Sequence, residues 1–164
     1  MSEWVKNVPG VPDYTVDAFR EKRSDYCLLI PIINEGKRIL TELERAQKGA
    51  VDGLCDIILC DGGSTDGSME PRGLERRGVN TLLTKKGPGK QGAQLRMGIH
   101  YALERGYEGI LTIDGNNKDS IESVPLFIEK LEEGYDLIQG SRFIPGGKAI
   151  NTPFSRYWAV RLIH

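Results

Sequence analysis

Polar side chains that could bind a cation follow an apolar run near residue 110. Residues 109–120 read G-I-L-T-I-D-G-N-N-K-D-S, so the apolar run ends on Asp114 and Asn116 comes two residues later. Carboxylate and amide oxygens are the ligands that Mg²⁺ and Mn²⁺ prefer, which makes Asp114 and Asn116 candidate metal ligands. The same residues also suit an Asx turn between a strand and a helix, and both interpretations stay open.

A second polar stretch, D-G-G-S-T-D-G-S, runs from Asp61 to Ser68 after another apolar run. A carboxylate followed by glycines lets a ligand approach the backbone closely, and it can accept hydrogen bonds from a base or from ribose hydroxyls. The alternative is a tight glycine turn in which Ser64 or Asp66 caps a short helix.

A third stretch, K-K-G-P-G-K-Q-G-A-Q-L-R, runs from Lys85 to Arg96. Glycines and cations before a helix favour phosphate binding. The stretch is not a P-loop, because Thr84 replaces the first glycine and Gln91 follows the lysine; the dinucleotide fingerprint G-x-G-x-x-G is also missing after the first long apolar run. A flexible basic loop is the alternative interpretation.

The elements that must position these stretches alternate along the chain. Apolar runs predict strands at 26–33, 55–60, 79–84, 109–114 and 135–140. Helical spacing of apolar residues predicts helices around 39–46, 91–105 and 120–131, and a weaker one at 66–77, where Pro71 and Gly73 interrupt. This order predicts an α/β layer fold with a mostly parallel sheet, whose ligands bind outside the carboxyl ends of the strands. The three polar stretches should therefore meet at one edge.

Composition narrows the class of protein. The 164 residues are 39% hydrophobic and 27% charged, with a net charge of −1, so nothing in the composition indicates nucleic-acid binding. No signal peptide is visible, and the run from Cys27 to Ile33 is too short to span a bilayer. An odd count of three cysteines predicts buried thiols in a reducing cytosol. Residues 1–24 are expected to be an arm packing on the domain or a disordered lead, and residues 25–164 the domain itself.

The polar stretches, taken in order, resemble the family 2 glycosyltransferases, which have the GT-A fold. The resemblance covers residues 26–143 and consists of I-P-I-I-N-E, C-D-G-G-S-T-D-G-S, G-K-Q-G-A-Q-L-R-M-G, T-I-D-G-N-N-K-D and G-S-R-F. Within that family, the set looks most like the polyprenyl-phosphate sugar transferases of the dolichol-phosphate mannose type.

The resemblance implies roles for individual residues. A nucleotide pocket would be formed by Pro31, Ile33, Asn34, Glu35, Asp61, Gly62, Gly63 and Ser64. Lys90 and Arg96 would lie near the diphosphate, and Asp114 with Gly115 would begin the metal-binding D-x-D. Ser141 and Arg142 would lie on the sugar or acceptor side. Asp114, Lys90 and Arg142 are the expected catalytic residues.

Two features depart from the family pattern. D-G-N-N-K replaces the usual second aspartate by Asn116 and puts Lys118 where a neutral third ligand is expected, so Mg²⁺ or Mn²⁺ should bind weakly or be dispensable. If the cation is dispensable, Lys118 would neutralise the diphosphate directly. Relatives also continue into acceptor-binding helices, so the acceptor region is expected to be incomplete. The terminal basic and aromatic residues suit either a membrane surface or a helix packed on the sheet; they include Arg156, Tyr157, Trp158, Arg161 and Leu162.

The expected function is sugar transfer from a UDP- or GDP-sugar, with inversion implied by the family. A polyprenyl phosphate acceptor is favoured because it is already ionised, whereas a hydroxyl acceptor would need a carboxylate base, and Asp119 and Asp136 are poorly placed for that role. The expected location is the cytoplasm, at the inner face of the membrane. Two alternatives stay open, a non-catalytic nucleotide-binding relative and a nucleotidyltransferase. A nucleotidyltransferase would have a glycine-rich basic signature after the first strand, and this chain has I-N-E-G there.

Overall fold

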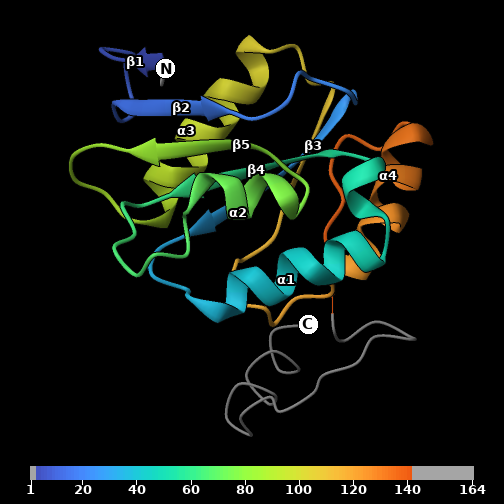
Figure 1. Cartoon of the computed structure of the whole chain (residues 1–164). Coiled ribbons are helices and arrows are strands. Elements are labelled where there is room, and N and C mark those ends of the chain that lie inside the picture. Colours follow the sequence, from blue (N-terminus) through green and yellow to red (C-terminus); the bar gives the residue numbers. More distant parts are fainter. Residues whose placement is uncertain (1–2, 142–164) are drawn as a thin grey trace, which may run out of the picture.

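A computed structural model of the chain describes residues 3–141, and a six-stranded sheet lies at its centre (Figure 1). Its strands are β1 (Glu3–Val5), β2 (Tyr14–Ala18), β3 (Tyr26–Ile32), β4 (Asp56–Asp61), β5 (Val79–Lys85) and β6 (Gly109–Thr112). They lie in the order β1-β2-β5-β4-β3-β6. The last four in that order are parallel to one another, and the two N-terminal strands are antiparallel to their neighbours. The predicted α/β fold with a mostly parallel sheet is confirmed.

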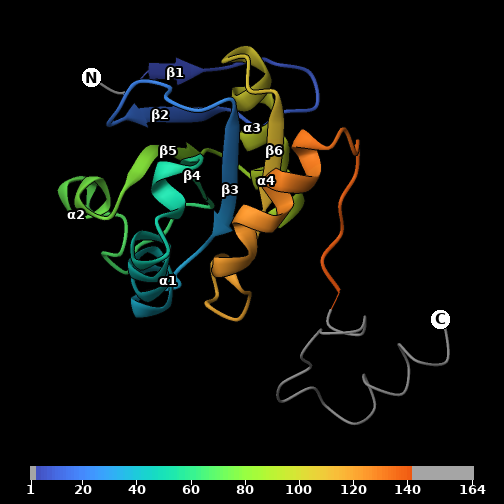
Figure 2. The same ribbon diagram turned by 90° about the vertical axis from the view of Figure 1, so that its right-hand side faces the viewer.

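Helices cover both faces of the sheet, because its central strands carry apolar side chains on both faces. On one face, α3 (Gln91–Glu104) packs on Leu29 and Cys60. On the other face, α1 (Lys37–Lys48), α2 (Pro71–Arg76), the 3-10 turns η1 (Val51–Gly53) and η2 (Ile121–Ser123), and α4 (Val124–Glu132) pack on alternate residues of the same strands. Figure 2 shows α3 on the opposite side of the sheet from α1 and α2.

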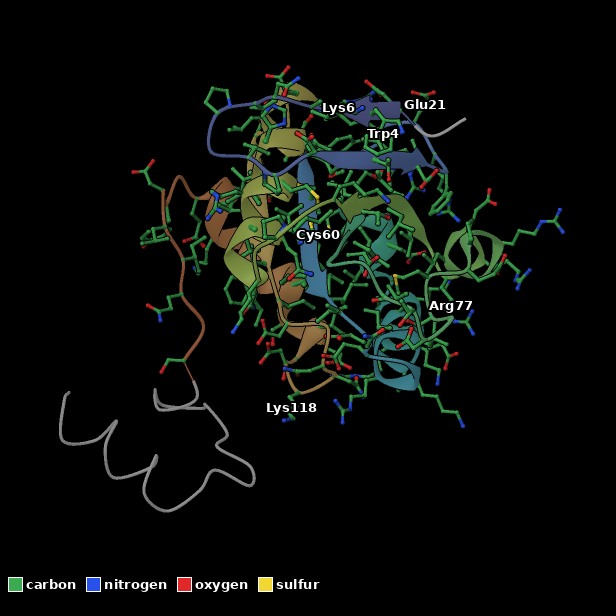
Figure 3. The ribbon with its side chains drawn as sticks, turned by 90° about the vertical axis from the view of Figure 1, so that its left-hand side faces the viewer. Trp4, Lys6, Glu21, Cys60, Arg77 and Lys118 are labelled. Carbon is green, nitrogen blue, oxygen red and sulfur yellow. The ribbon has the colours of Figure 1, made fainter. Side chains whose placement is uncertain are left out.

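The three cysteines are free and buried, as predicted. Cys60 lies within the core between β4 and α3 (Figure 3). Burial raises the pKa of the Cys27 and Cys55 thiols to about 12, so both remain protonated at neutral pH. These thiols therefore act as small apolar core groups.

The N-terminal residues contribute directly to the sheet. β2 pairs with β5 in a register that places Val16 opposite Leu83, and β1 then pairs with β2. Tyr14 and Val16 are buried with the α3 side of the core. A hairpin thus covers the edge of β5, where sequence analysis predicts only an arm or a disordered lead.

Three sequence predictions need correction. Residues 135–140 are not a strand: Tyr135 and Leu137 are exposed, and a run of strand formers makes a strand only where it finds a hydrogen-bonding partner. The helix predicted at 66–77 is limited to α2, because Pro71 starts it and Glu70 caps it through the Arg72 and Gly73 N–H groups. β6 ends at Thr112, since the Asp114 N–H turns away to the Asp119 carboxylate.

The strand order has a switch point between β3 and β6. From β3 the chain moves in one direction to β4 and β5, and then returns to the other side of β3 as β6. The last β3–β6 pair is Leu29 with Thr112, so Pro31 lies beyond this ladder and its missing N–H costs no pairing with β6. Such a switch point is where ligands bind in open α/β sheets.

Within residues 3–141, none of the helices has the length and apolar character needed to cross a membrane.

Candidate active site

The carboxyl end of β4 forms a tight turn held by its own aspartate. Asp61 is buried, and its Oδ1 accepts hydrogen bonds from the Ser64 hydroxyl at 2.6 Å and the Ser64 N–H at 3.0 Å. Gly63 adopts φ of 100°, which a residue with a side chain rarely adopts. The carboxylate has about four lone-pair positions, so Asp61 can hold the turn and still accept a further hydrogen bond.

The turn after β3 is tied to the turn after β4. The Asn34 N–H donates to Ser64 Oγ at 2.9 Å, and Asn34 Oδ1 accepts from the Thr65 N–H at 2.8 Å. Asp66 Oδ2 accepts from the Gly36 N–H at 2.8 Å. Hydrogen bonds from Ser68, chiefly from its hydroxyl, lower the pKa of Asp66. The two predicted nucleotide loops therefore form one connected surface.

Gln94 supports this surface from below. This α3 residue is buried, and its Nε2 donates to the Ile32 carbonyl and, at 2.8 Å, to the Cys60 carbonyl. A β-carbon on Gly62 would lie 3.0 Å from the same nitrogen and 3.2 Å from Ile33 Cδ1. Gly62 is thus fitted between Gln94 and Ile33, whose side chain is 54% exposed.

After β6, Asp114 contacts the start of α3. Gln91 Nε2 donates to Asp114 Oδ1 at 2.6 Å, although the two residues are 23 positions apart. Lys90, the residue before the first helical one, is exposed. The loops after β5 and β6 therefore meet, as the strand-end rule predicts.

The loop from 114 to 119 is closed by its own polar groups. Asn116 Oδ1 accepts from the Lys118 N–H at 3.0 Å, so the Asx turn considered for this segment is present. Asp119 Oδ2 accepts from the Asp114 N–H at 3.3 Å. Lys118 extends outward at the tip of the loop, away from the sheet (Figure 3). An Asx turn leaves Asn116 Oδ1 a second lone pair, so the turn and a ligand role are compatible.

Helix α1 holds the far half of this loop. Arg45 forms a two-pronged ion pair with Glu122, with Nε–Oε1 at 2.7 Å and Nη2–Oε2 at 2.6 Å, which lowers the pKa of Glu122. Its Nη1 donates to Asn117 Oδ1 at 2.7 Å and its Nη2 to the Asp119 carbonyl at 3.2 Å. One guanidinium thus fixes three residues of the segment from 117 to 122.

A buried carboxyl group lies beneath the same loop. Glu42 is fully buried; its Oε2 accepts from the Asn117 N–H at 3.2 Å, whereas Oε1 has no hydrogen-bond partner in the described part of the chain. The pKa of Glu42 is raised to about 7, chiefly by burial and to a smaller extent by the negative charges of Asp119 and Asp114, against the lowering effects of the Asn117 N–H and Arg45. Glu42 therefore titrates near neutral pH.

Other predicted site residues lie outside this cluster. The Arg96 Nε donates to the Gly10 carbonyl at 2.7 Å, and its side chain lines a cavity of about 440 Å³ together with the N-terminal loop and Lys86. Glu35 forms an ion pair with Arg38 at 3.2 Å. Pro31 is buried in β3. Arg142, predicted to be catalytic, lies outside the described residues.

Sequence reasoning missed the residues that support the site. Gln94 shares the core-facing side of α3 with Met97 and Tyr101, and Glu42 shares that of α1 with Ile39 and Leu43. Each of them is a polar residue at a position where the helical repeat is otherwise apolar, and this pattern could have identified both from the sequence. The Gln91–Asp114 and Arg45–Glu122 contacts join segments far apart in sequence and left no such signal.

Comparison with known proteins shows which proteins this chain resembles. No protein-family model matches the sequence. The chain is 31% identical over 131 residues to the undecaprenyl-phosphate mannosyltransferase of Micrococcus luteus, covering 78% of this chain and 52% of that protein. It is 27% identical over 135 residues to the polyprenol monophosphomannose synthase of Mycolicibacterium smegmatis, covering 79% and 49%.

The chain thus spans about half the length of these curated relatives. Among solved structures, TarS of S. aureus superposes with a TM-score of 0.40 at 21% identity, over 65% of this chain and 20% of TarS. The curated relatives confirm the resemblance seen in the strand-end motifs: the chain is similar to polyprenyl-phosphate sugar transferases, which is consistent with a family 2 glycosyltransferase.

Proposed function

We propose that this chain carries the donor-binding part of a glycosyltransferase that moves a sugar from a UDP- or GDP-sugar to polyprenyl phosphate, with inversion at the anomeric carbon. The observation that carries the proposal is the gathering of polar loops at the switch point of the sheet. The linked Asn34 and Asp61–Ser64 turns end β3 and β4, and Asp114 follows the neighbouring β6, in a chain similar to polyprenyl-phosphate sugar transferases.

In this proposal the nucleoside lies on the linked turns after β3 and β4. Asp61 accepts a hydrogen bond from the base or ribose with a lone pair that Ser64 leaves free. Gly62 keeps the wall of the pocket flat, because any larger residue would meet Gln94 and Ile33. The exposed side chain of Ile33 offers an apolar surface to the base.

The diphosphate lies between Asp114 and the start of α3. Lys90 is exposed there, and among residues 3–141 its ammonium group has no ion pair or hydrogen bond, so it is available for a phosphate. Lys118 is exposed on the opposing loop. These cations would stabilise the negative charge that develops on the leaving nucleoside diphosphate.

The residues present fit a weakly held divalent cation. Asp114 supplies a carboxylate with one oxygen free, and Asn116 supplies an amide oxygen with a spare lone pair. In the described part of the chain, no three His, Cys, Asp or Glu side chains form a metal-binding group. Bound there, Mg²⁺ or Mn²⁺ would neutralise charge on the diphosphate.

A phosphate acceptor suits this site better than a hydroxyl acceptor. Within residues 3–141, Glu42 is the carboxyl group whose pKa is raised toward neutrality, but it is fully buried and cannot reach an acceptor. A polyprenyl phosphate attacks as an anion and needs no such base. This acceptor implies that the protein works at a membrane surface.

Calorimetry with UDP and GDP, each with and without Mn²⁺, tests the donor site. The expected result is binding of one nucleotide by the wild-type chain and its loss in Asp114→Ala. Failure of both nucleotides to bind would contradict the proposal. Release of free nucleoside diphosphate from the matching nucleotide sugar then separates an enzyme from a relative that binds without turnover.

A further inference from the structure

Gln91 occupies the position from which a side chain reaches Asp114. It is the first residue of α3, it is exposed, and its Nε2 lies 2.6 Å from Asp114 Oδ1. The contact connects the only carboxylate among the predicted metal ligands to a neutral carboxamide on another element of the fold. A glutamine carries both a donor and an acceptor on the same planar group.

The predicted cation site needs more oxygen ligands than its own loop supplies. Mg²⁺ takes six oxygens at about 2.1 Å, and Asp114 and Asn116 provide two of them. A diphosphate and water can complete the set, but neither fixes the position of the cation on the protein. Of the next two residues, Asn117 turns its amide oxygen to Arg45, and Lys118 cannot ligate a cation while protonated.

The contact geometry places the Gln91 amide oxygen within reach of such a cation. An ionised carboxylate can only accept, so the amide presents its nitrogen to Asp114 when no cation is bound. A cation on Asp114 Oδ1 would repel that N–H group. Half a turn of the amide about its last side-chain bond replaces Nε2 by Oε1 in the same place, next to the same carboxylate oxygen.

We propose that Gln91 is an oxygen ligand of the divalent cation, and that it supplies from α3 the neutral ligand that the 114–119 loop lacks. The inference rests on the proposed function, because the cation is that of the donor diphosphate. Because Lys90 is the next residue to Gln91, the cation and the Lys90 ammonium group would then lie beside the same diphosphate.

The first test measures Mn²⁺ affinity directly, by titrating Mn²⁺ into the full chain saturated with the nucleotide that binds and following free Mn²⁺ by electron paramagnetic resonance. Gln91→Leu removes the amide oxygen and should weaken Mn²⁺ binding about 10- to 100-fold, as the loss of a supporting metal partner typically does. Gln91→Glu offers a charged oxygen at the same place and should tighten Mn²⁺ binding.

Gln47→Leu is the matched control. Gln47 is an exposed glutamine on α1 whose Nε2 makes one hydrogen bond, to the Arg76 carbonyl at 2.9 Å, away from the strand ends. This substitution should leave Mn²⁺ affinity unchanged. Thermal unfolding of each variant checks that its fold is intact, which the exposed position of Gln91 favours.

The outcomes separate this inference from the proposed function. Unchanged Mn²⁺ affinity in both Gln91 variants, with binding lost in Asp114→Asn, would show that Gln91 is only a structural contact and would overturn the inference while the donor site stands. The inference would also be overturned if both Gln91 variants lost nucleotide affinity equally while their Mn²⁺ affinity stayed at the wild-type value. A wild-type chain that binds no nucleotide would instead contradict the proposed function.

Discussion

Gly115 packs directly against Ile32, so the loop that carries Asp114 rests on the end of β3. A β-carbon at position 115 would overlap Ile32 Cγ2 and would lie 3.1 Å from Ile30 Cγ2. The position of Asp114 therefore depends on the absence of a side chain at the next residue. This contact connects the core of the sheet to the candidate catalytic residue.

Gly115→Ala should destabilise the protein and weaken nucleotide binding. The added methyl group must push the loop away from β3, and overpacking of this kind typically costs about 1 to 3 kcal/mol. Urea unfolding and calorimetry with UDP or GDP measure the two effects. Gly53→Ala is the control, because a β-carbon there has no atom within 4 Å. Equal stability of the two variants would contradict the packing argument.

Glu42→Gln should remove a pH dependence of stability. The pKa of Glu42 is raised from 4.5 to about 7 in the folded state, so folding favours the protonated form. The free energy of unfolding of the wild type should therefore fall as pH rises from about 4.5 to about 7, by a total on the order of 1 to 3 kcal/mol.

The Glu42→Gln variant should lose this decline and exceed the wild type in stability at pH 8. Glu44→Gln, at an exposed position of the same helix, should keep the wild-type profile. Urea unfolding at several pH values gives both curves. Parallel curves for wild type and Glu42→Gln would show that Glu42 is already ionised in the folded protein.

Arg45→Met should loosen the loop from 114 to 122. The substitution removes the paired hydrogen bonds to Glu122 and the contact with Asn117. Because the guanidinium is partly exposed, solvent screens the ion pair, and the loss of stability should be about 1 kcal/mol. Hydrogen exchange should accelerate at the amides of residues 116–120 and remain unchanged in Arg76→Met, an exposed arginine of α2.

Asp114→Ala should abolish sugar transfer, and EDTA should reduce transfer by the wild type. Asp114→Ala removes the carboxylate that would hold the cation, and EDTA removes the cation itself. In both cases the negative charge on the leaving diphosphate is no longer stabilised. Release of nucleoside diphosphate from the nucleotide sugar is the measurement, with Asp136→Ala as an exposed-aspartate control. Transfer that is insensitive to EDTA and sensitive to Lys118→Ala would move charge neutralisation from the cation to the lysine.

Sequence reasoning located the candidate site because the strand-end rule uses only local patterns. Apolar runs predict β3 and β6 in full and most of β4 and β5, and the residues that follow these runs include Asp61 and Asp114. Short strands without such runs were missed, since Glu3–Val5 and Tyr14–Ala18 become strands only by pairing with β5 and with each other.

The strand predicted at 135–140 does not form, because its local pattern is strong but it has no pairing partner within the part of the chain that the structure describes. Its residues favour extended backbone, but local preference does not supply a partner, and Leu137 remains 87% exposed. Contacts such as Gln91 with Asp114 depend on where two loops meet in space. No pattern in the sequence indicates that these two residues are in contact.

The pairing of β2 with β5 also bears on how the chain folds during synthesis. Val16 leaves the ribosome well before its partner Leu83, so the N-terminal hairpin must wait for a strand that is made much later. Until then, β2 presents unpaired backbone groups and the apolar side chains of Tyr14 and Val16. Chaperone dependence and aggregation of nascent chains should therefore be greatest before β5 emerges.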